Sequence, residues 1–271
     1  MRVKFWGVRG SVSCAYPDFL EFGGNTSCVE LEIAGRTVIL DAGTGIPWLG
    51  NDLLKREVKD IHLLMSHFHN DHTGGLNYFK PIYIPGHSIH VKAALNYGDR
   101  TIEDLFRRHM SEELHPVQYD NLASNTDCWG FNAGDEFDLF EGAHVKTYML
   151  THPAGCTAYR IEAEGKVLVY ATDTEHTPGK TDQGLVEMMQ GADLVIYDTT
   201  YTEEELPSKV GWGHSTWNEG VRLCQLAGAK RMAMFHHSPD YNDDVMRELE
   251  ADAKTAWSGA FAAKEGMEII L

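Results

Sequence analysis

The chain lacks the cysteine patterns of disulfide-rich proteins and of cysteine-only zinc sites. Its 271 residues include five cysteines, which are odd in number, scattered along the chain, and form no Cys-x-x-Cys pair. Such a set predicts neither a disulfide framework nor a structural zinc site built from thiolates alone. We expect most of these thiols to be buried, where they behave as small hydrophobic side chains.

Long apolar runs and targeting segments are also missing. No uninterrupted apolar stretch approaches the roughly 20 residues that a membrane-spanning helix needs. Residues 1–7 lack the extended apolar region of a signal peptide and are typical of a first strand. We therefore expect no membrane partner and a cytoplasmic location.

Positive charge is scarce, since 23 lysines and arginines face 40 aspartates and glutamates, for a formal net charge of −17. Proteins that grip long nucleic acids normally carry a basic footprint, because phosphate contacts supply much of the affinity. We therefore expect that a nucleic-acid polymer is not the partner. A local basic patch is the alternative to scattered solvated charges in one stretch, which contains Lys80, Lys92, Arg100, Arg107 and Arg108.

Short apolar runs typical of buried strands recur along the chain and end at polar residues. Val29, Leu31 and Ile33 alternate with glutamates, which is the period of a half-buried strand. Chemistry-bearing residues follow several later runs, and α/β folds commonly place their sites at such strand ends. The runs are 37–40 before Asp41, 61–65 before Ser66, 145–149 before His152, 167–170 before Asp173, 194–196 before Asp198, and 232–235 before His236.

Three helices are predicted in the second half, near 182–190, 215–228 and 241–257. The second begins with Thr216-Trp217-Asn218-Glu219, which has the pattern of a capping box. The stretch 85–130 has weak periodicity, with helical pieces around 100–110, and we interpret it as an insertion or lid. No linker or repeat divides the chain, so we expect a single domain over residues 1–271.

The densest chemistry lies in Ser66-His67-Phe68-His69-Asn70-Asp71-His72, directly after a predicted strand. It offers four potential metal ligands within six residues. His67 and His69 are two apart, so an extended segment presents them on one side, and Asp71 and His72 follow as the chain turns. Imidazole and carboxylate together suit zinc or another divalent transition metal.

This His-x-His-x-Asp-His run resembles the signature of the metallo-β-lactamase superfamily. His152, Asp173 and His236 are similar, in order and in strand-end position, to the remaining ligands of that family, and Asp41 resembles its early strand-end aspartate. The resemblance implies an α/β fold, a four-layer αββα sandwich of two mixed β-sheets flanked by helices.

The resemblance also implies two divalent metal ions per chain, with zinc expected and manganese or iron as alternatives. His67, His69 and His152 would hold the first ion. Two ions that share an oxygen lower the pKa of bound water and offset developing charge on a phosphoryl oxygen. Asp41 would orient a ligand histidine, with a simple turn role as the alternative. The second ion would be held by Asp71, His72 and His236, with Asp173 and a hydroxide bridging both ions.

Gly213-His214-Ser215-Thr216 resembles an element of transfer-RNA 3′-endonucleases of the ribonuclease Z type and of related cyclic-nucleotide phosphodiesterases. A histidine there could protonate the leaving alkoxide, so His214 is a candidate catalytic residue, with a simple place before a helix N-cap as the alternative. Asp71 is the second candidate, as proton acceptor from the attacking water. We prefer His236 to His237 as the last ligand, because residues 235–238 resemble the corresponding segment of the transfer-RNA branch.

Two glycine-rich segments near the N-terminus, 7–11 and 23–28, are similar to the opening of bacterial metal-dependent phosphodiesterases of this fold. Glycines allow the backbone to approach a site closely. Arg9 and Asn25 are therefore candidates either for contact with the substrate or for support of the metal ligands, although a lone arginine is more often structural. His237 is a candidate for the surroundings of the ligands.

The sequence therefore predicts a dinuclear metal-dependent hydrolase. The favoured substrate is a small phosphodiester, such as a cyclic nucleotide, cleaved by metal-bound hydroxide. Transfer-RNA 3′ processing is an alternative, as is a thioesterase or lactonase reaction at the same site. A non-enzymatic binding protein would be indicated by missing ligands, and none is missing. The resemblance also suggests a homodimer.

Overall fold

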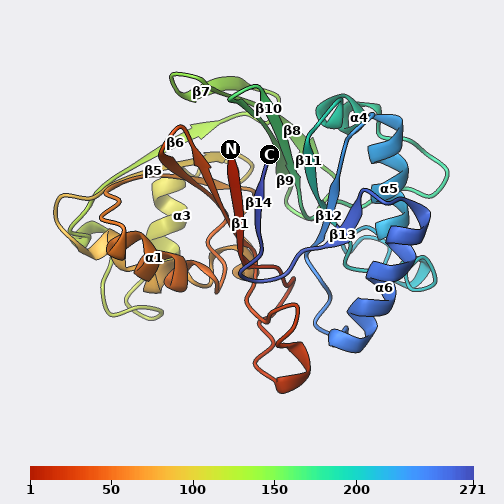
Figure 1. The fold of residues 1–271 in the computed structure, drawn as a ribbon. Coiled ribbons are helices and arrows are strands. Elements are labelled where there is room, and N and C mark those ends of the chain that lie inside the picture. Colours follow the sequence, from red (N-terminus) through yellow and green to blue (C-terminus); the bar gives the residue numbers. More distant parts are fainter.

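Two seven-stranded β-sheets pack face to face, and α-helices cover the outer face of each (Figure 1). The computed structural model describes residues 1–271. The strand order is β14-β1-β2-β3-β4-β5-β6 in the first sheet and β13-β12-β11-β10-β9-β8-β7 in the second. Both sheets combine parallel and antiparallel neighbours. The predicted four-layer αββα sandwich is therefore confirmed.

The first sheet is built mainly from the N-terminal half of the chain. Its strands β3, β4, β5 and β6 run parallel, while β1 is antiparallel to both β2 and the C-terminal β14. The strands are β1 (Arg2–Gly7), β2 (Cys28–Ile33), β3 (Arg36–Leu40), β4 (Asp60–Met65), β5 (Ser88–Ala94), β6 (Asn125–Phe131) and β14 (Glu268–Ile270).

The second sheet begins as an antiparallel meander and continues as parallel strands. The change comes at β10, which is antiparallel to β9 and parallel to β11. The strands are β7 (Glu136–Phe140), β8 (Ala143–Leu150), β9 (Cys156–Ala163), β10 (Lys166–Ala171), β11 (Leu194–Asp198), β12 (Met232–Phe235) and β13 (Ala260–Ala262).

The helices lie on the two outer faces, α1 and α3 on the first sheet and α4, α5 and α6 on the second (Figure 1). The α-helices are α1 (Ile46–Lys55), α2 (Asn70–Thr73), α3 (Ile102–His109), α4 (Gln183–Met189), α5 (Trp217–Leu226) and α6 (Asp243–Ala256). Short 3₁₀ helices are η1 (Pro17–Phe19), η2 (Leu76–Tyr78), η3 (Lys80–Tyr83), η4 (Tyr119–Asn121) and η5 (Leu206–Ser208).

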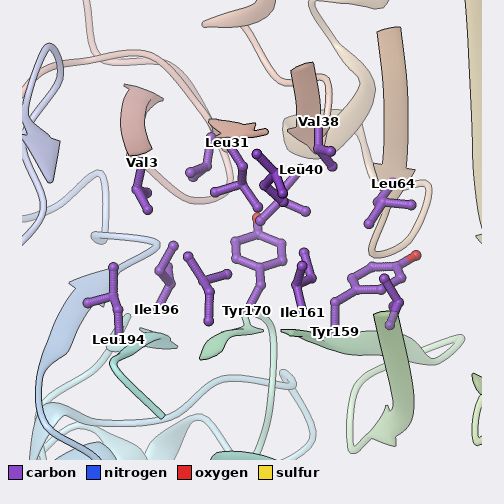
Figure 2. Close-up of a cluster of buried hydrophobic side chains, with 14 of the residues drawn as sticks. Val3, Leu31, Val38, Leu40, Leu64, Tyr159, Ile161, Tyr170, Leu194 and Ile196 are labelled. Carbon is purple, nitrogen blue, oxygen red and sulfur yellow. The ribbon is translucent and has the colours of Figure 1, made fainter. Parts of the chain in front are cut away.

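The central core fills the space between the sheets (Figure 2). Leu31 and Leu40 from the first sheet meet Ile161, Tyr170 and other side chains from the second, all fully buried. The inward positions of each strand alternate with outward ones, which follows from the two-residue period of β-structure. Burial of this size supplies the main free energy that holds the two sheets together.

The three helices predicted for the second half are confirmed as α4, α5 and α6. Thr216 caps α5, because its hydroxyl accepts a hydrogen bond from the backbone N–H of Glu219 at 3.2 Å. The reciprocal half of the predicted capping box is absent, since the Glu219 carboxylate instead pairs with Arg222 at 2.7 Å. The sequence therefore predicted where α5 begins. It did not predict the partner of Glu219, which is Arg222 in the next helical turn.

Much of the stretch 85–130 belongs to the first sheet, which corrects the expectation of an insertion or lid over that whole range. β5 and β6 pair in parallel with each other, and α3 connects them across the outer face. Alternate residues of β6 are exposed or only half-buried, because it is an edge strand of the sheet. The apolar periodicity of β6 is therefore weak, and the sequence did not predict this strand.

None of the helices has the length and apolar character needed to cross a bilayer.

His62 on β4 is a buried histidine, and the folded state is most stable while its ring is neutral. Its ring lies 5.2 Å from that of Phe140, and neither ring nitrogen has a hydrogen-bond partner. Burial, together with the nearby His90, lowers the pKa of His62 to about 4. The unfolded chain binds a proton near pH 6.5, so stability falls as the pH drops from about 6.5 toward 4.

We predict that His62→Leu makes the free energy of unfolding less sensitive to acid over that range, as measured by urea denaturation at several pH values. His144→Gln is a control in which the effect of pH on stability has the opposite sign. Hydrogen bonds to Asp138 and Glu136 raise the pKa of His144, so its contribution is present below pH 6.5 and is lost as the pH rises. An unchanged acid dependence in His62→Leu would contradict the assignment.

Candidate metal centre

The carboxyl ends of strands from both sheets meet at one edge of the sandwich. There the sheets are joined directly, since the hydroxyl of Tyr159 donates to the carbonyl of Met65 at 2.6 Å. The backbone N–H of Thr157 also donates to the carbonyl of Ser66 at 2.9 Å. The polar residues that follow β3, β4, β8, β10 and β12 therefore come together, although they are far apart in the sequence.

Three of these strand-end residues have a left-handed backbone. The φ angles are 61° at Asp41, 52° at Asp173 and 61° at His236. A residue with a Cβ adopts this conformation at an energetic cost, and such residues concentrate at functional sites. Each turn redirects the chain immediately after a buried strand, and all three side chains are buried.

A first group of potential ligands consists of His67, His69 and His152. Nδ1 of His69 lies 3.0 Å from Nε2 of His152, and Nε2 of His67 is buried without any hydrogen-bond partner. Burial lowers the pKa of each of these three rings, so each is neutral near pH 7 and keeps a lone pair for a cation. His67 is buried while His69 is exposed, so the group opens to solvent.

A second group consists of Asp71, His72, Asp173 and His236. Nε2 of His236 lies 3.0 Å from Oδ2 of Asp71 and 3.3 Å from Nε2 of His72. Burial disfavours a charged His72, but the carboxylates of Asp173, Asp71 and Asp41 raise its pKa well above 6.5. The surroundings of this group therefore favour a positive charge.

Asp173 lies between the two groups. Its Oδ2 is 3.6 Å from Nε2 of both His67 and His152, whereas its Oδ1 is 3.1 Å from Nε2 of His72 and 3.3 Å from Nε2 of His236. Each carboxylate oxygen thus faces one group. Neutral imidazoles, carboxylates and an unpartnered buried nitrogen together form a donor set that fits two divalent cations.

Asp41 fixes the ring of His72. Its Oδ2 is 2.7 Å from Nδ1 of His72 and also accepts hydrogen bonds from the hydroxyls of Ser66 at 2.7 Å and Tyr170 at 2.8 Å. A carboxylate in this position selects the tautomer that leaves Nε2 of His72 free toward the second group. Tyr170 donates to Asp41 from the opposite sheet. The core shown in Figure 2 therefore helps, through Asp41, to orient the ring of His72.

The N-terminal loop after β1 covers the second group with its backbone. The N–H of Ser11 donates to Oδ2 of Asp71 at 2.7 Å. At Gly10 an added Cβ would overlap the ring of His236, so only glycine fits this close approach. The structure therefore places Gly10 against a candidate ligand, whereas Gly7 packs against the backbone of Thr26.

Arg9 and Asn25 do not face the centre, which corrects the expectation that they contact substrate. The Arg9 guanidinium is fully buried and donates to the carbonyls of Gly23 at 2.8 Å and Tyr241 at 2.7 Å. The side-chain amide of Asn25 donates to Glu265 at 3.0 Å. Both side chains anchor the N-terminal loop through hydrogen bonds within the protein, although Nη2 of Arg9 is buried without a partner.

The structure separates the neighbours His236 and His237. His236 lies in the second group, and its Nδ1 is 2.9 Å from the hydroxyl of Thr200. His237 turns away from the centre, and its Nε2 donates to the carbonyl of Ala263 at 2.9 Å. Burial lowers the pKa of His237 to about 3, so this ring is a neutral part of the interior.

His214 lies over the centre with its ring stacked on that of His236, the centroids 4.9 Å apart. Its Nδ1 is 2.8 Å from Oδ2 of the buried Asp198. Burial opposes a charged ring, but the carboxylates, Asp198 foremost, raise the pKa of His214 to about 9. His214, Asp198, Asp173 and His236 also form a third cluster of potential ligand atoms. Because Asp198 occupies Nδ1, we treat His214 as a proton-carrying group.

Several residues around the centre escaped prediction from the sequence. Ser11 acts through its backbone, and Tyr170 belongs to the core by its pattern, so neither gave a signal. Glu175 accepts from the backbone N–H of Gly213 at 2.8 Å and so holds the segment before His214. Asp198 was noted at the end of a predicted strand, which is β11, but its contact with His214 was not predicted.

Comparison with known proteins gives the family. Residues 36–237 match the family described as Beta-lactamase superfamily domain. A protein named Ribonuclease Z from Porphyromonas gingivalis is 33% identical, and the alignment covers 89% of this chain and 91% of that one. A Ribonuclease Z from Gemmatimonas aurantiaca is 32% identical over 53% of this chain, and the matched part covers only 41% of that protein.

A solved structure shows the same fold. The metallo-beta-lactamase fold protein YhfI from Bacillus subtilis superposes with a TM-score of 0.72 at 19% sequence identity, covering 99% of this chain and 98% of that one.

The relatives overturn one expectation, that a nucleic-acid polymer is not a partner. The Porphyromonas gingivalis relative, similar over nearly its whole length, is named a ribonuclease. The expectation was wrong because it relied on net charge, which says nothing about where the basic residues lie. By its family match, its fold and its full-length relative, the chain belongs to the beta-lactamase superfamily and is a metal-dependent hydrolase.

Proposed function

We propose that this chain hydrolyses phosphodiesters at a centre of two divalent metal ions, zinc by preference. His67, His69 and His152 would hold one ion, and Asp173 would be shared between the two. When bound, such ions activate water and offset the charge of a phosphoryl group. The second ion would be held by Asp71, His72 and His236.

The observation that carries this proposal is the position of His214 beside the two groups. When a phosphodiester is hydrolysed, one P–O ester bond breaks and the leaving group departs as an alkoxide, which needs a proton. The transition state of this step is anionic. The Asp198 carboxylate holds Nδ1 of His214 at 2.8 Å, and the stacking on His236 places the ring over the second group. His214 can therefore supply both a positive charge and a proton.

Asp71 supports the centre as an anionic ligand more than as a base. Burial opposes its charge, but His72 and His236 hold the pKa of Asp71 well below its ordinary value. The backbone N–H of Ser11 further stabilises the carboxylate. Such a group is a weak proton acceptor, so we propose ligation as its main role.

RNA is the substrate class that we favour, because the relative similar over nearly its whole length is named Ribonuclease Z. A small phosphodiester such as a cyclic nucleotide is the second candidate. The net charge of −17 does not decide between the two candidates, since it says nothing about the charge beside the centre.

We predict metal-dependent turnover of bis(p-nitrophenyl) phosphate when the chain is assayed beside a thioester and a lactone. Metal content should be read on the same sample. Turnover of the thioester or lactone alone would contradict phosphodiester hydrolysis. A precursor transfer RNA with a 3′ trailer and a 3′,5′-cyclic nucleotide should then be compared, and the larger kcat/KM identifies which candidate substrate class is right.

His214→Ala should lower kcat by about 10²- to 10⁴-fold on a substrate with an alkoxide leaving group. The loss should be smaller with p-nitrophenolate, which leaves without a proton. Metal content, measured by mass spectrometry, should stay at the wild-type value. Loss of metal would show that His214 is a ligand, and equal losses on both substrates would refute proton donation.

Asp41→Asn should weaken binding of one of the two metal ions about 10- to 100-fold, because the amide cannot hold His72 as the carboxylate does. Competition with a fluorescent chelator measures this affinity. Tyr170→Phe is the matched control, since it removes another partner of Asp41 without changing the contact with His72. Equal loss in both variants would indicate general disruption instead.

A further inference from the structure

A pocket of about 420 Å³ adjoins the candidate metal centre on the side of His69. Phe68 and Tyr97 line it, with their rings edge to face and centroids 5.7 Å apart. The Tyr97 hydroxyl accepts a hydrogen bond from the backbone N–H of Phe68 at 3.0 Å, which fixes the ring. Since His69 is the exposed member of the first group, the pocket continues the open side of the centre.

Two arginines without acidic partners stand at this pocket. Arg100 and Arg108 line it, both are exposed, and neither has a carboxylate oxygen within 4.0 Å. Arg107, between them in sequence, pairs instead with Asp120 at 2.9 Å. Arg100 is oriented by its own hydrogen bond to the carbonyl of Tyr97 at 3.0 Å. The pocket therefore presents two guanidinium groups that no carboxylate neutralises, in a chain of strong negative charge, and the Arg100 guanidinium lies 5.7 Å from the Tyr97 ring centroid.

This combination of groups selects a particular chemistry. Guanidinium groups bind phosphate through paired charge-assisted hydrogen bonds. Aromatic rings beside them offer a surface for a nucleobase, as in sites for single-stranded nucleic acid. A thioester or a lactone would use neither feature. A cyclic mononucleotide has a single phosphate, which the metal centre would take.

We propose that this pocket binds the nucleotide next to the scissile phosphodiester, with its base against Tyr97 and its phosphate between Arg100 and Arg108. The inference rests on the proposed phosphodiester hydrolysis and narrows its substrate to an oligonucleotide or RNA chain with at least two phosphates. It also identifies the basic footprint that net charge conceals.

The test compares an oligoribonucleotide with bis(p-nitrophenyl) phosphate, which carries one phosphate and no nucleobase. The measured quantity is the ratio of the two kcat/KM values. We expect Arg100→Ala and Arg108→Ala each to lower this ratio about ten-fold, since a hydrogen bond to a charged group contributes on that scale. The loss should lie in KM for the oligonucleotide and should shrink with added salt.

Arg107→Ala is the matched control, because it removes an arginine of the same stretch that already has a partner. Its ratio should equal that of the wild type. Tyr97→Ala should lower the ratio about 5- to 100-fold through lost stacking, and Tyr97→Phe should retain it. An unchanged ratio in Arg100→Ala and Arg108→Ala, or the same fall in Arg107→Ala, would overturn the pocket assignment.

The outcome separates this inference from the proposed function. If bis(p-nitrophenyl) phosphate is turned over and the ratio is unchanged in the arginine variants, the proposed phosphodiester hydrolysis stands and the pocket assignment is refuted. If no phosphodiester is turned over, the proposed function fails. In that case, binding of a phosphorothioate oligoribonucleotide, measured by fluorescence anisotropy, tests the pocket assignment without requiring turnover. Weaker binding in the arginine variants than in Arg107→Ala supports it, and equal binding refutes it.

Discussion

The buried carboxylate of Asp173 is the feature on which the rest of the site depends. Its two oxygens face different sets of imidazoles, at 3.6 Å on one side and 3.1–3.3 Å on the other. A buried charge of this kind is stable only where opposite charges or strong hydrogen bonds surround it. The fold meets that requirement by bringing strand ends from both sheets to one edge, where cations can be bound by both sets.

The rigidity of this edge comes from the core behind it. Tyr170 and Tyr159 each belong to the packed layer between the sheets, and each donates a hydrogen bond across to the other sheet near the centre. Side chains fixed in this way hold the ligands in place before any cation binds, which lowers the cost of assembling the site. The left-handed backbone at Asp41, Asp173 and His236 is tolerated because this framework is strong enough to impose it.

The distribution of charge matters more than its sum. Forty acidic residues give the chain its net charge, yet several of them are the candidate metal ligands or the carboxylates that contact those ligands and His214. Arg107 pairs with Asp120, and the Lys92 ammonium lies over the ring of Trp129. Arg100 and Arg108, from the same stretch, line the pocket beside His69 without a carboxylate partner. A local patch and scattered charges were both compatible with the sequence, and each describes part of the stretch.

The grouping of the candidate ligands could be predicted from the sequence, because four side chains able to bind metal directly after a buried strand rarely occur together outside a metal site. The strand-end positions of His152, Asp173 and His236 and the sandwich fold followed from the same pattern and its family resemblance. Tertiary structure alone decided which way His236 and His237 point, that Arg9 is an internal anchor, and that Ser11 reaches Asp71. These outcomes depend on backbone turns and on neighbours remote in the chain, whereas periodicity and spacing describe only residues close along it.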